Sequence, residues 1–184
     1  MKCIKTALPD VYIIEPTAFG DSRGYFLESY NQNTFKEVVG KTCFVQDNES
    51  KSSKGVLRGL HFQKPPYDQA KLVRCIEGEV LDVVVDLRIK SKTYGQHLAV
   101  LLSGDNKRQL FVPRGFAHGF VVISDSATFA YKVDNIYAPD HDAGIRWNDK
   151  ELTIQWGIED SEVLVSEKDA KLPLFSEFKS PFTL

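Results

Sequence analysis

Short runs of alternating apolar and polar residues follow one another along most of this chain. Turn residues separate them, as at Pro65 and Pro66, Glu77 and Gly78, and residues 103–106. Many short strands at this spacing are typical of an antiparallel sandwich or barrel. The predicted strands span residues 25–30, 43–48, 55–63, 70–76, 79–87, 96–102, 108–112, 117–123 and 128–133. The pattern therefore predicts an all-β fold.

Helical patterning is rare by comparison. Residues 34–39 are predicted to form a short helix, which Gly40 ends. The segment after Pro139 has no regular period and is expected to pack outside the sheets. No repeat or linker divides the chain, so a single domain over residues 1–184 is expected, with the tail at 174–184 left unassigned.

Strand parity indicates which side chains face the interior. Tyr131 shares a strand face with Phe129 and Val133, so its ring is expected to point inward. Lys71 shares a face with Val73 in the same way. A basic group is thus expected on an inward-looking face.

The strand at residues 55–63 carries the most informative polar residues. A lone strand histidine is usually a core residue, but here Arg58 lies three positions from His61. The two fall on opposite faces of an ideal strand. Gly59 between them could host a β-bulge that turns both into one cavity, and without a bulge only one of them lines it.

Nearby strands add further polar groups, at Gln46, Asn48 and Lys71. Burying so many polar groups on apolar strands costs too much desolvation free energy unless they line a wet pocket. A histidine beside fixed cations suits proton transfer on an anionic substrate.

Composition narrows the choice of partners and compartment. The chain has 184 residues and a net charge of −2, with 23 basic and 25 acidic residues, which predicts no nucleic-acid or membrane partner. Cys3, Cys43 and Cys75 are scattered and odd in number, which favours a reducing cytoplasm over a disulfide framework. No apolar leader or membrane-spanning run is expected.

Residues 113–118, Pro-Arg-Gly-Phe-Ala-His, resemble the second motif of the cupins, a family of double-sheet jelly rolls. Metal-binding cupins also need two histidines one residue apart, and here His61 is followed by Phe62 and Gln63. His97 and His141 are expected on the surface or in loops. A two-histidine, one-carboxylate set remains an alternative, but a metal-free site without cofactor is favoured. In the two-histidine, one-carboxylate alternative, the metal ligands would be His61, His118 and Glu79.

Several blocks together resemble the dTDP-4-dehydrorhamnose 3,5-epimerase family, metal-free cupins of dTDP-L-rhamnose synthesis. The resemblance runs in order from about residue 16 to 173. The matching blocks are residues 19–28 (FGDSRGYFLE), 44–48 (FVQDN), 55–63 (GVLRGLHFQ), 69–75 (QAKLVRC), 114–120 (RGFAHGF) and 131–132 (YK).

This resemblance implies a cupin-type jelly roll that epimerises dTDP-4-keto-6-deoxyglucose at C3 and C5. Both carbons flank the C4 ketone, so loss of either proton gives an enolate, which needs a base, an opposed acid and a cation at the oxygen. By resemblance His61 is the base and Tyr131 the acid. Asp169 would orient the imidazole, and Lys71 would stabilise the enolate oxygen.

The resemblance also implies the substrate contacts and a homodimer whose neighbouring subunit completes the nucleotide end. Asp142 stands where many members of the family have glutamate. Arg23, Arg58 and His118 correspond to phosphate and sugar contacts, Glu28, Gln46 and Asn48 to nucleotide-positioning residues, Tyr137 to the ring that stacks on thymine, and Asp142 and Lys168 to further contacts.

Taken singly, some of these residues have simpler interpretations. Arg23 and Glu28 could form an exposed ion pair. Tyr131 could be a core tyrosine bonded to backbone, Tyr137 could cap a turn, and Asp169 could lie on a solvated face.

Three other functions fit parts of the pattern. A C3-only epimerase or ketoisomerase would act on a related dTDP-keto-sugar, but Tyr131 favours double epimerisation. A non-catalytic sugar-nucleotide scaffold would not need an opposed acid and base. A metal-dependent oxygenase is disfavoured because the second histidine is missing.

Overall fold

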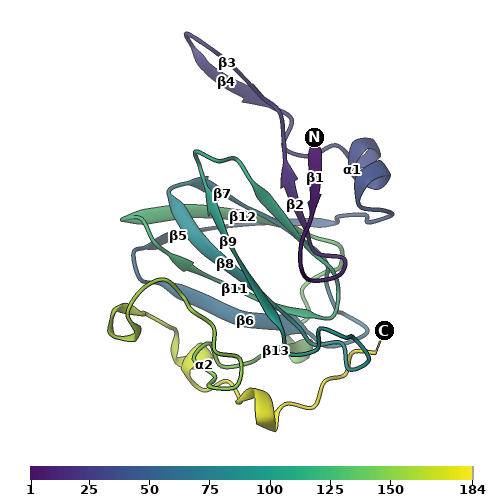
Figure 1. Ribbon diagram of the computed structural model, residues 1–184, viewed down its shortest axis with the longest axis vertical. Helices are drawn as coiled ribbons and strands as arrows, with labels where there is room; N and C mark the ends of the chain where they lie inside the picture. The colour runs from purple at the N-terminus through teal and green to yellow at the C-terminus, as the bar shows by residue number, and fades with distance from the viewer. Residues whose placement is uncertain (184) are drawn as a thin grey trace.

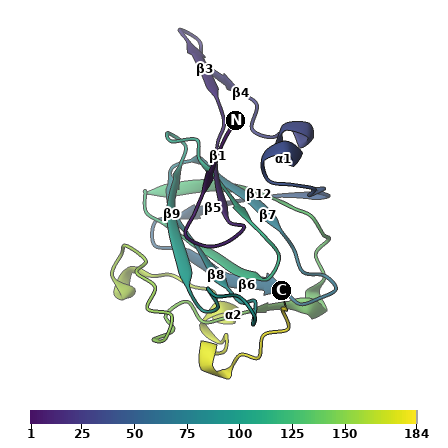
Figure 2. The same cartoon turned by 45° about the vertical axis from the view of Figure 1, so that its right-hand side comes forward.

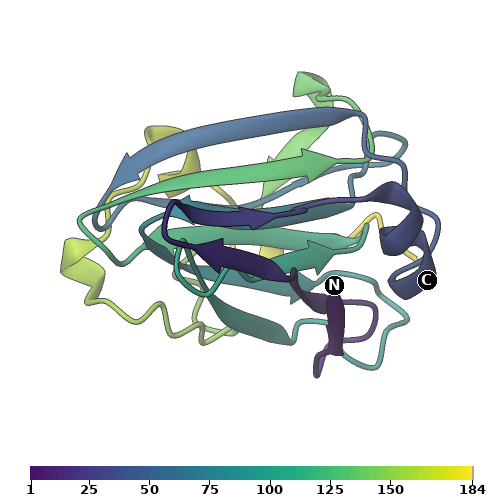
Figure 3. The same cartoon turned by 90° about the horizontal axis from the view of Figure 1, so that it is seen from above.

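Two antiparallel sheets enclose the main hydrophobic core in the computed structural model of this chain, which describes residues 1–183. They appear as stacked layers from above (Figure 3). One sheet has six strands in the order β1-β2-β10-β7-β12-β5, and the other has five in the order β13-β6-β11-β8-β9. The predicted all-β sandwich of cupin type is confirmed.

The elements are bounded as follows. The six-stranded sheet contains β1 (Lys2–Lys5), β2 (Tyr12–Glu15), β10 (Gln109–Val112), β7 (Lys71–Glu77), β12 (Ser126–Val133) and β5 (Gln46–Ser53). The five-stranded sheet contains β13 (Asp142–Gly144), β6 (Leu57–Gln63), β11 (Phe116–Val122), β8 (Glu79–Asp86) and β9 (His97–Ser103). A separate hairpin contains β3 (Ala18–Asp21) and β4 (Gly24–Leu27), and the helices are α1 (Gln32–Val38), α2 (Glu167–Ala170) and the 3₁₀ turns η1 (Pro139–His141), η2 (Asp160–Glu162) and η3 (Phe175–Glu177).

The predicted strands from residue 55 to 133 all form, with ends that differ by at most two residues. Two earlier predictions are displaced, because β4 ends at Leu27 and β5 begins only at Gln46. The sequence pattern missed β1, β2, β3 and β13. Each of these has three or four residues, too few for a period of two to be recognisable.

Each sheet is covered on its outer face, and the two covers lie on opposite sides of the molecule (Figures 1 and 2). The predicted early helix forms as α1, and its Phe35 packs against the six-stranded sheet. The chain after η1 covers the five-stranded sheet through Trp147, Trp156 and Phe182, as expected for this segment. Residues 174–183 of the tail therefore pack against the sheet, and Leu184 is outside the described residues. None of the helices within residues 1–183 has the length and hydrophobicity needed to cross a membrane.

Covering both faces explains the sequence of β8 and β11. On β8, Val80 and Val84 face the core between the sheets, while Val83 and Val85 face the C-terminal segment. Strands buried on both faces become nearly continuous apolar runs. Asp82 interrupts this run and is fully buried.

A bulge in β6 lies where β6 passes closest to β11. Arg58 pairs with Phe120 and His61 pairs with His118, so β6 has one residue more than β11 between the two pairs. Gly59 permits this path, with φ of +133° and its ideal Cβ position 2.5 Å from the Cα of Gly119. The bulge expected at Gly59 is confirmed, and it turns both Arg58 and His61 into the interior.

We expect Gly59→Ala to destabilise the fold by more than about 3 kcal/mol, because a Cβ there meets backbone as well as an unfavourable φ. Gly40→Ala is the matched control, since Gly40 also has a positive φ, +118°, but no heavy atom lies within 4 Å of its Cβ position. The control should lose only about 1 kcal/mol from backbone strain. Urea unfolding of both variants measures the difference, and equal losses would contradict the close-approach explanation.

Candidate active site

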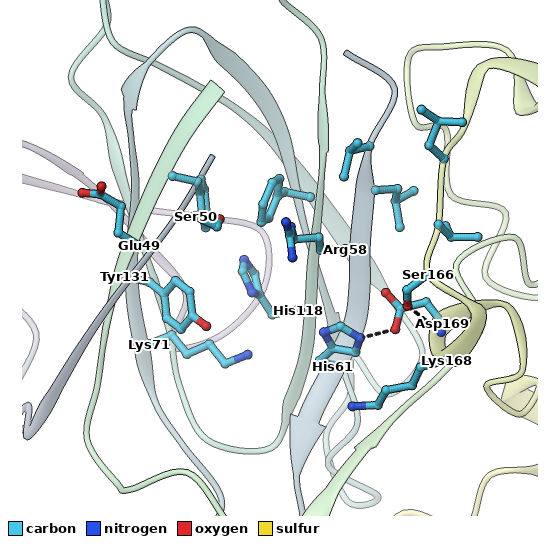
Figure 4. Close-up of a pocket in the computed structure, with 16 residues that line it drawn as sticks. Glu49, Ser50, Arg58, His61, Lys71, His118, Tyr131, Ser166, Lys168 and Asp169 are labelled. Atoms are coloured by element: carbon cyan, nitrogen blue, oxygen red, sulfur yellow. Dashed lines mark hydrogen bonds and ion pairs between the residues drawn. The ribbon is translucent and has the colours of Figure 1, made fainter. Parts of the chain in front are cut away.

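A cavity of about 500 Å³ opens between the two sheets at the bulge. This volume lies in the range of small-molecule sites. Figure 4 shows its polar lining, contributed by both sheets and by the C-terminal segment. The labelled lining residues are Glu49, Ser50, Arg58, His61, Lys71, His118, Tyr131, Ser166, Lys168 and Asp169.

His61 forms a hydrogen-bonded pair with Asp169, at 2.7 Å between Nε2 and Oδ1. Asp169 is 4% exposed, so a solvated surface position is wrong for it. Its own backbone N–H donates to the Ser166 Oγ at 3.1 Å, and its Oδ2 accepts from the Gly59 N–H at 3.4 Å. Burial alone would raise the pKa of Asp169, but the contacts with His61, Gly59 and Ser166 together outweigh it and lower that pKa. The carboxylate therefore stays charged against the imidazole.

Tyr131 faces His61 across the cavity, from β12 of the opposite sheet (Figure 4). Its hydroxyl makes no hydrogen bond to any residue between 1 and 183, which contradicts the interpretation as a backbone-bonded core tyrosine. Burial raises the pKa of Tyr131, with Arg58 opposing. The phenol thus keeps its proton at neutral pH and can serve as an acid.

Lys71 projects from β7 between these two groups (Figure 4). It is buried, and desolvation lowers its pKa to about 8 despite the nearby carboxyl groups of Asp82 and Asp142. An ammonium in a poorly solvated cavity attracts a developing negative charge more strongly than one in water.

Arg58 and His118 line the same cavity. The Arg58 guanidinium reaches across to the opposite sheet and donates to Ser52 Oγ, at 3.2 Å from Nε and 3.1 Å from Nη2. His118 Nε2 lies 2.8 Å from Asp82 Oδ2. Asp82 is not among the predicted site residues, although an acid inside the apolar run of β8 is a signal of a special role.

A second group of predicted contacts lies next to the cavity, and of these only Lys168 lines it. The side chain of Gln46 donates to Asn48 at 2.9 Å and accepts from the Tyr137 N–H at 3.3 Å. The Tyr137 hydroxyl donates to Asp142 Oδ2 at 3.2 Å, and Lys168 forms an ion pair with the same oxygen. The tyrosine is 54% exposed, which leaves its ring accessible.

Arg23 and Glu28 do not reach the cavity of their own chain. Arg23 lies at the tip of the β3–β4 hairpin, which projects beyond the sheets (Figures 1 and 2), and pairs with Asp21. Glu28 follows the hairpin and accepts a hydrogen bond from Asn31 at 3.2 Å. The suggested ion pair between Arg23 and Glu28 is therefore wrong.

The two histidines of the alternative metal set each bond a carboxylate instead, Asp169 and Asp82. No cluster of three or more His, Cys, Asp or Glu side chains within the described 183 residues has metal-binding geometry. His97 is a half-buried residue of β9 rather than the surface or loop residue that was expected.

A double-sheet barrel with a histidine–aspartate pair opposite a phenol defines a cupin-type acid–base enzyme. The dTDP-4-dehydrorhamnose 3,5-epimerase family model matches residues 5–177. The enzyme of that name from Shigella flexneri is 56% identical over 170 residues, which cover 92% of this chain and 93% of the relative. The chain therefore belongs to the dTDP-4-dehydrorhamnose 3,5-epimerase family of isomerases.

Solved structures agree with this assignment. The dTDP-6-deoxy-D-glucose-3,5-epimerase of Legionella pneumophila, in complex with dTDP-4-keto-L-rhamnose, superposes with a TM-score of 0.93 at 46% identity, covering 97% of this chain and 94% of that one. A 3′-monoepimerase from Streptomyces bikiniensis, in complex with dTDP-quinovose, gives 0.89 at 30% identity, covering 94% and 87%. Single and double epimerases thus share this fold.

We expect Asp169→Asn to lower kcat by about 10²–10⁴-fold, because the imidazole loses the anion that orients it and balances its charge. Glu167→Gln is the matched control on the same helix, since Glu167 contacts only the exposed Lys171, at 3.7 Å. The rate of deuterium uptake from solvent into the substrate measures both variants. A native rate in Asp169→Asn would contradict a role for the pair.

Proposed function

We propose that this chain converts dTDP-4-keto-6-deoxyglucose to dTDP-4-keto-L-rhamnose by proton transfer at C3 and C5. The observation that carries the proposal is the opposition of His61 and Tyr131 across one cavity, with the Lys71 ammonium between them. An enolisation followed by inversion needs these three groups in this relation.

The proposed reaction transfers protons at the two carbons that flank the ketone. His61 removes the proton from a carbon next to the C4 ketone, and the electron pair of the broken C–H bond forms an enolate whose charge lies on the C4 oxygen. Lys71 stabilises that charge. Tyr131 then gives its hydroxyl proton to the same carbon from the opposite face, which inverts the centre. His61 releases its proton and Tyr131 regains one by exchange with solvent, and the cycle repeats at the second carbon.

We assign the remaining residues to binding. The planar Arg58 guanidinium, with its paired N–H donors, suits the oxygens of a diphosphate. His118 is more deeply buried and lines the same cavity as Lys71. At the outer end, the exposed ring of Tyr137 is proposed to stack on thymine, with Gln46 and Asn48 placing the nucleotide. Asp142 and Lys168 complete this end, and their ion pair supports a role for Asp142 despite its shorter side chain.

We propose a homodimer in which the β3–β4 hairpin completes the nucleotide end of the neighbouring subunit. Its large apolar side chains are unusually exposed, with Phe19 at 65% and Phe26 at 71%, and Arg23 lies at its tip. An exposed two-stranded hairpin with such a surface is typical of an interaction site.

The proposed reaction uses side chains alone, without metal or cofactor, and we place it in the cytoplasm. The broken histidine pair and the carboxylate partners of His61 and His118 support the first point. The three free cysteines support a reducing compartment.

A C3-only epimerase is the second candidate, because a 3′-monoepimerase has the same fold. That monoepimerase has also been solved with a histidine and a tyrosine replaced that lie as far apart in sequence as His61 and Tyr131, so the presence of Tyr131 does not separate the two reactions. The 56% identity to a 3,5-epimerase favours double epimerisation. A binding scaffold is disfavoured since binding alone requires no opposed acid and base.

We expect His61→Ala and Tyr131→Phe to fold normally and to differ in chemistry. His61→Ala should lose deuterium exchange at both carbons, by at least about 10²–10⁴-fold, because no base remains. Tyr131→Phe should retain exchange but lose inversion, at C5 as at C3, because the acid on the opposite face is missing in both cycles. NMR in D₂O, with a chelator present, resolves both positions.

Tyr30→Phe serves as the control, since that phenol packs against Phe35 outside the cavity. A native rate of product formation by Tyr131→Phe would contradict the two-face mechanism. Label at C3 alone in the unmodified protein would indicate the C3-only reaction, and loss of activity with chelator would indicate a metal.

We expect mixtures of Arg23→Ala and His61→Ala to be more active than either variant alone. A mixed dimer contains one site with an intact His61 from one subunit and an intact Arg23 from the other. Mixing after mild dissociation should restore up to about a quarter of the native activity per total subunit, as statistical pairing of two protomers gives. The mixture of Arg23→Ala with Arg58→Ala should recover likewise, whereas His61→Ala with Arg58→Ala should not, since those two residues belong to one chain's cavity.

A further inference from the structure

Asp82 is an acid in the most apolar part of the barrel. It is 0% exposed and follows the same face of β8 as Val80 and Val84, which belong to the core between the sheets. Its neighbours across the ladder are Phe120 and Val100. Burying a carboxyl group in such surroundings is unfavourable unless hydrogen bonds and an opposite charge compensate.

Hydrogen bonding compensates only one of its two oxygens. Oδ2 lies 2.8 Å from His118 Nε2. Oδ1 has no partner, and it is the single buried side-chain nitrogen or oxygen atom in residues 1–183 of which this is true. Asp82 takes part in none of the proposed proton transfers.

Lys71 is a buried cation that also lacks a bonded partner. The lysine is 9% exposed, and its ammonium forms no hydrogen bond or ion pair with another residue in the described part of the chain. Lys71 and Val73 face the same core as Asp82. The charge of Asp82 acts on Lys71 more strongly than any other carboxylate does.

Other charged and titratable groups also face this cation. They come from every wall of the cavity, so the environment of Lys71 is mixed in sign. They are Glu49 on β5, Arg58 and His61 on β6, His118 on β11, Tyr131 on β12, Asp142 on β13, and Lys168 and Asp169 on α2. Asp82 and Asp142 are the two carboxyl groups that favour the charged form of Lys71.

His118 connects Asp82 to the cavity. Burial lowers the pKa of His118, so its imidazole is neutral at neutral pH. Burial raises the pKa of Asp82, while the contact with His118 and the charge of Lys71 oppose that rise. In its ionised form Asp82 accepts at Oδ2, so the single ring proton of His118 lies on Nε2 and Nδ1 is an acceptor. Nδ1 has no partner among residues 1–183 and is not one of the buried unsatisfied atoms, so it opens to the cavity that His118 lines.

We propose that Asp82 is a positioning residue, the buried counter-charge that keeps Lys71 a cation and makes His118 a hydrogen-bond acceptor toward the cavity. The inference rests on the proposed function, because it assigns both effects to the enolisation site. His118 then suits a sugar hydroxyl, which donates a hydrogen bond, and does not suit a phosphate oxygen, which only accepts one. Asp82 touches neither substrate nor reacting atoms, and acts through the two residues that do.

The pH dependence of kcat/KM of Asp82→Asn tests the electrostatic part. Lys71 loses its proton as pH rises, so activity of the native protein should fall above about pH 8. Without the counter-charge the lysine deprotonates earlier, and the basic limb should move to lower pH by about one unit or more. Activity at pH 8 should then fall at least about fivefold, with a smaller loss at pH 6.

Asp86→Asn is the matched control. Asp86 is also fully buried on β8, but it bonds Arg88, Ser91 and Thr93 outside the cavity. This variant should lose thermal stability and keep the basic limb of the native protein. An unshifted basic limb in folded Asp82→Asn would overturn the proposal, because a merely structural residue leaves the profile in place.

Thermal unfolding of Asp82→Asn, Lys71→Met and the double variant tests the pairing without any substrate. Each single variant leaves one buried charge unpaired, whereas the double variant removes both, so its Tm should exceed that of either single variant. If Asp82→Asn alone fails to fold, the test remains valid, because adding Lys71→Met should restore folding. Additive losses, or a double variant no better folded than Asp82→Asn, would overturn the inference. Absence of epimerase activity in the native protein would instead contradict the proposed function and leave the Tm coupling intact.

Discussion

The close approach of β6 to β11 at Gly59 and Gly119 is the constraint on which the site depends. A Cβ on either glycine would collide with the other strand, since the ideal Cβ of Gly119 lies 2.7 Å from the Arg58 carbonyl oxygen. Two strands this close accommodate an extra residue only as a bulge. That bulge puts Arg58 and His61, which alternation would separate, into one cavity. The backbone there also donates to Asp169, so a single local distortion holds His61, Arg58 and Asp169 together.

The C-terminal segment links the stability of the barrel to its chemistry. It packs Trp147 and Trp156 against the outer face of the five-stranded sheet, and Leu164 pairs with the chain just before β6. The same segment carries Asp169 into contact with His61. Loosening this cover would therefore expose apolar surface and separate Asp169 from His61 at once. The packing of the cover and the geometry of the cavity are not separable in this part of the molecule.

Apolar and charged side chains alternate in the interior of the barrel. Phe129 lines the same cavity as Lys71 and His118. Asp82 lies between Val80 and Val84 on one face of β8. Groups of opposite sign that are buried together can offset much of one another's desolvation, but removing one member leaves the rest unpaired. The cavity therefore has an electrostatic character that was set before any ligand enters. Such preorganisation is what stabilises charge developing on a substrate.

The sequence by itself determined the features that depend on local periodicity. Alternation along each strand correctly placed Lys71 and Tyr131 on inward faces, and Gly59 between two polar residues indicated the bulge. Tertiary structure alone decided the contacts between distant segments. Asp169 lies in a charged run that reads as solvated surface, and it becomes buried only because the covering segment returns to β6. Arg23 reads as a neighbour of Glu28, yet the hairpin carries it away from its own cavity. A strand's period of two fixes the direction of a side chain, whereas its partner is chosen by register and by the path of residues far along the chain.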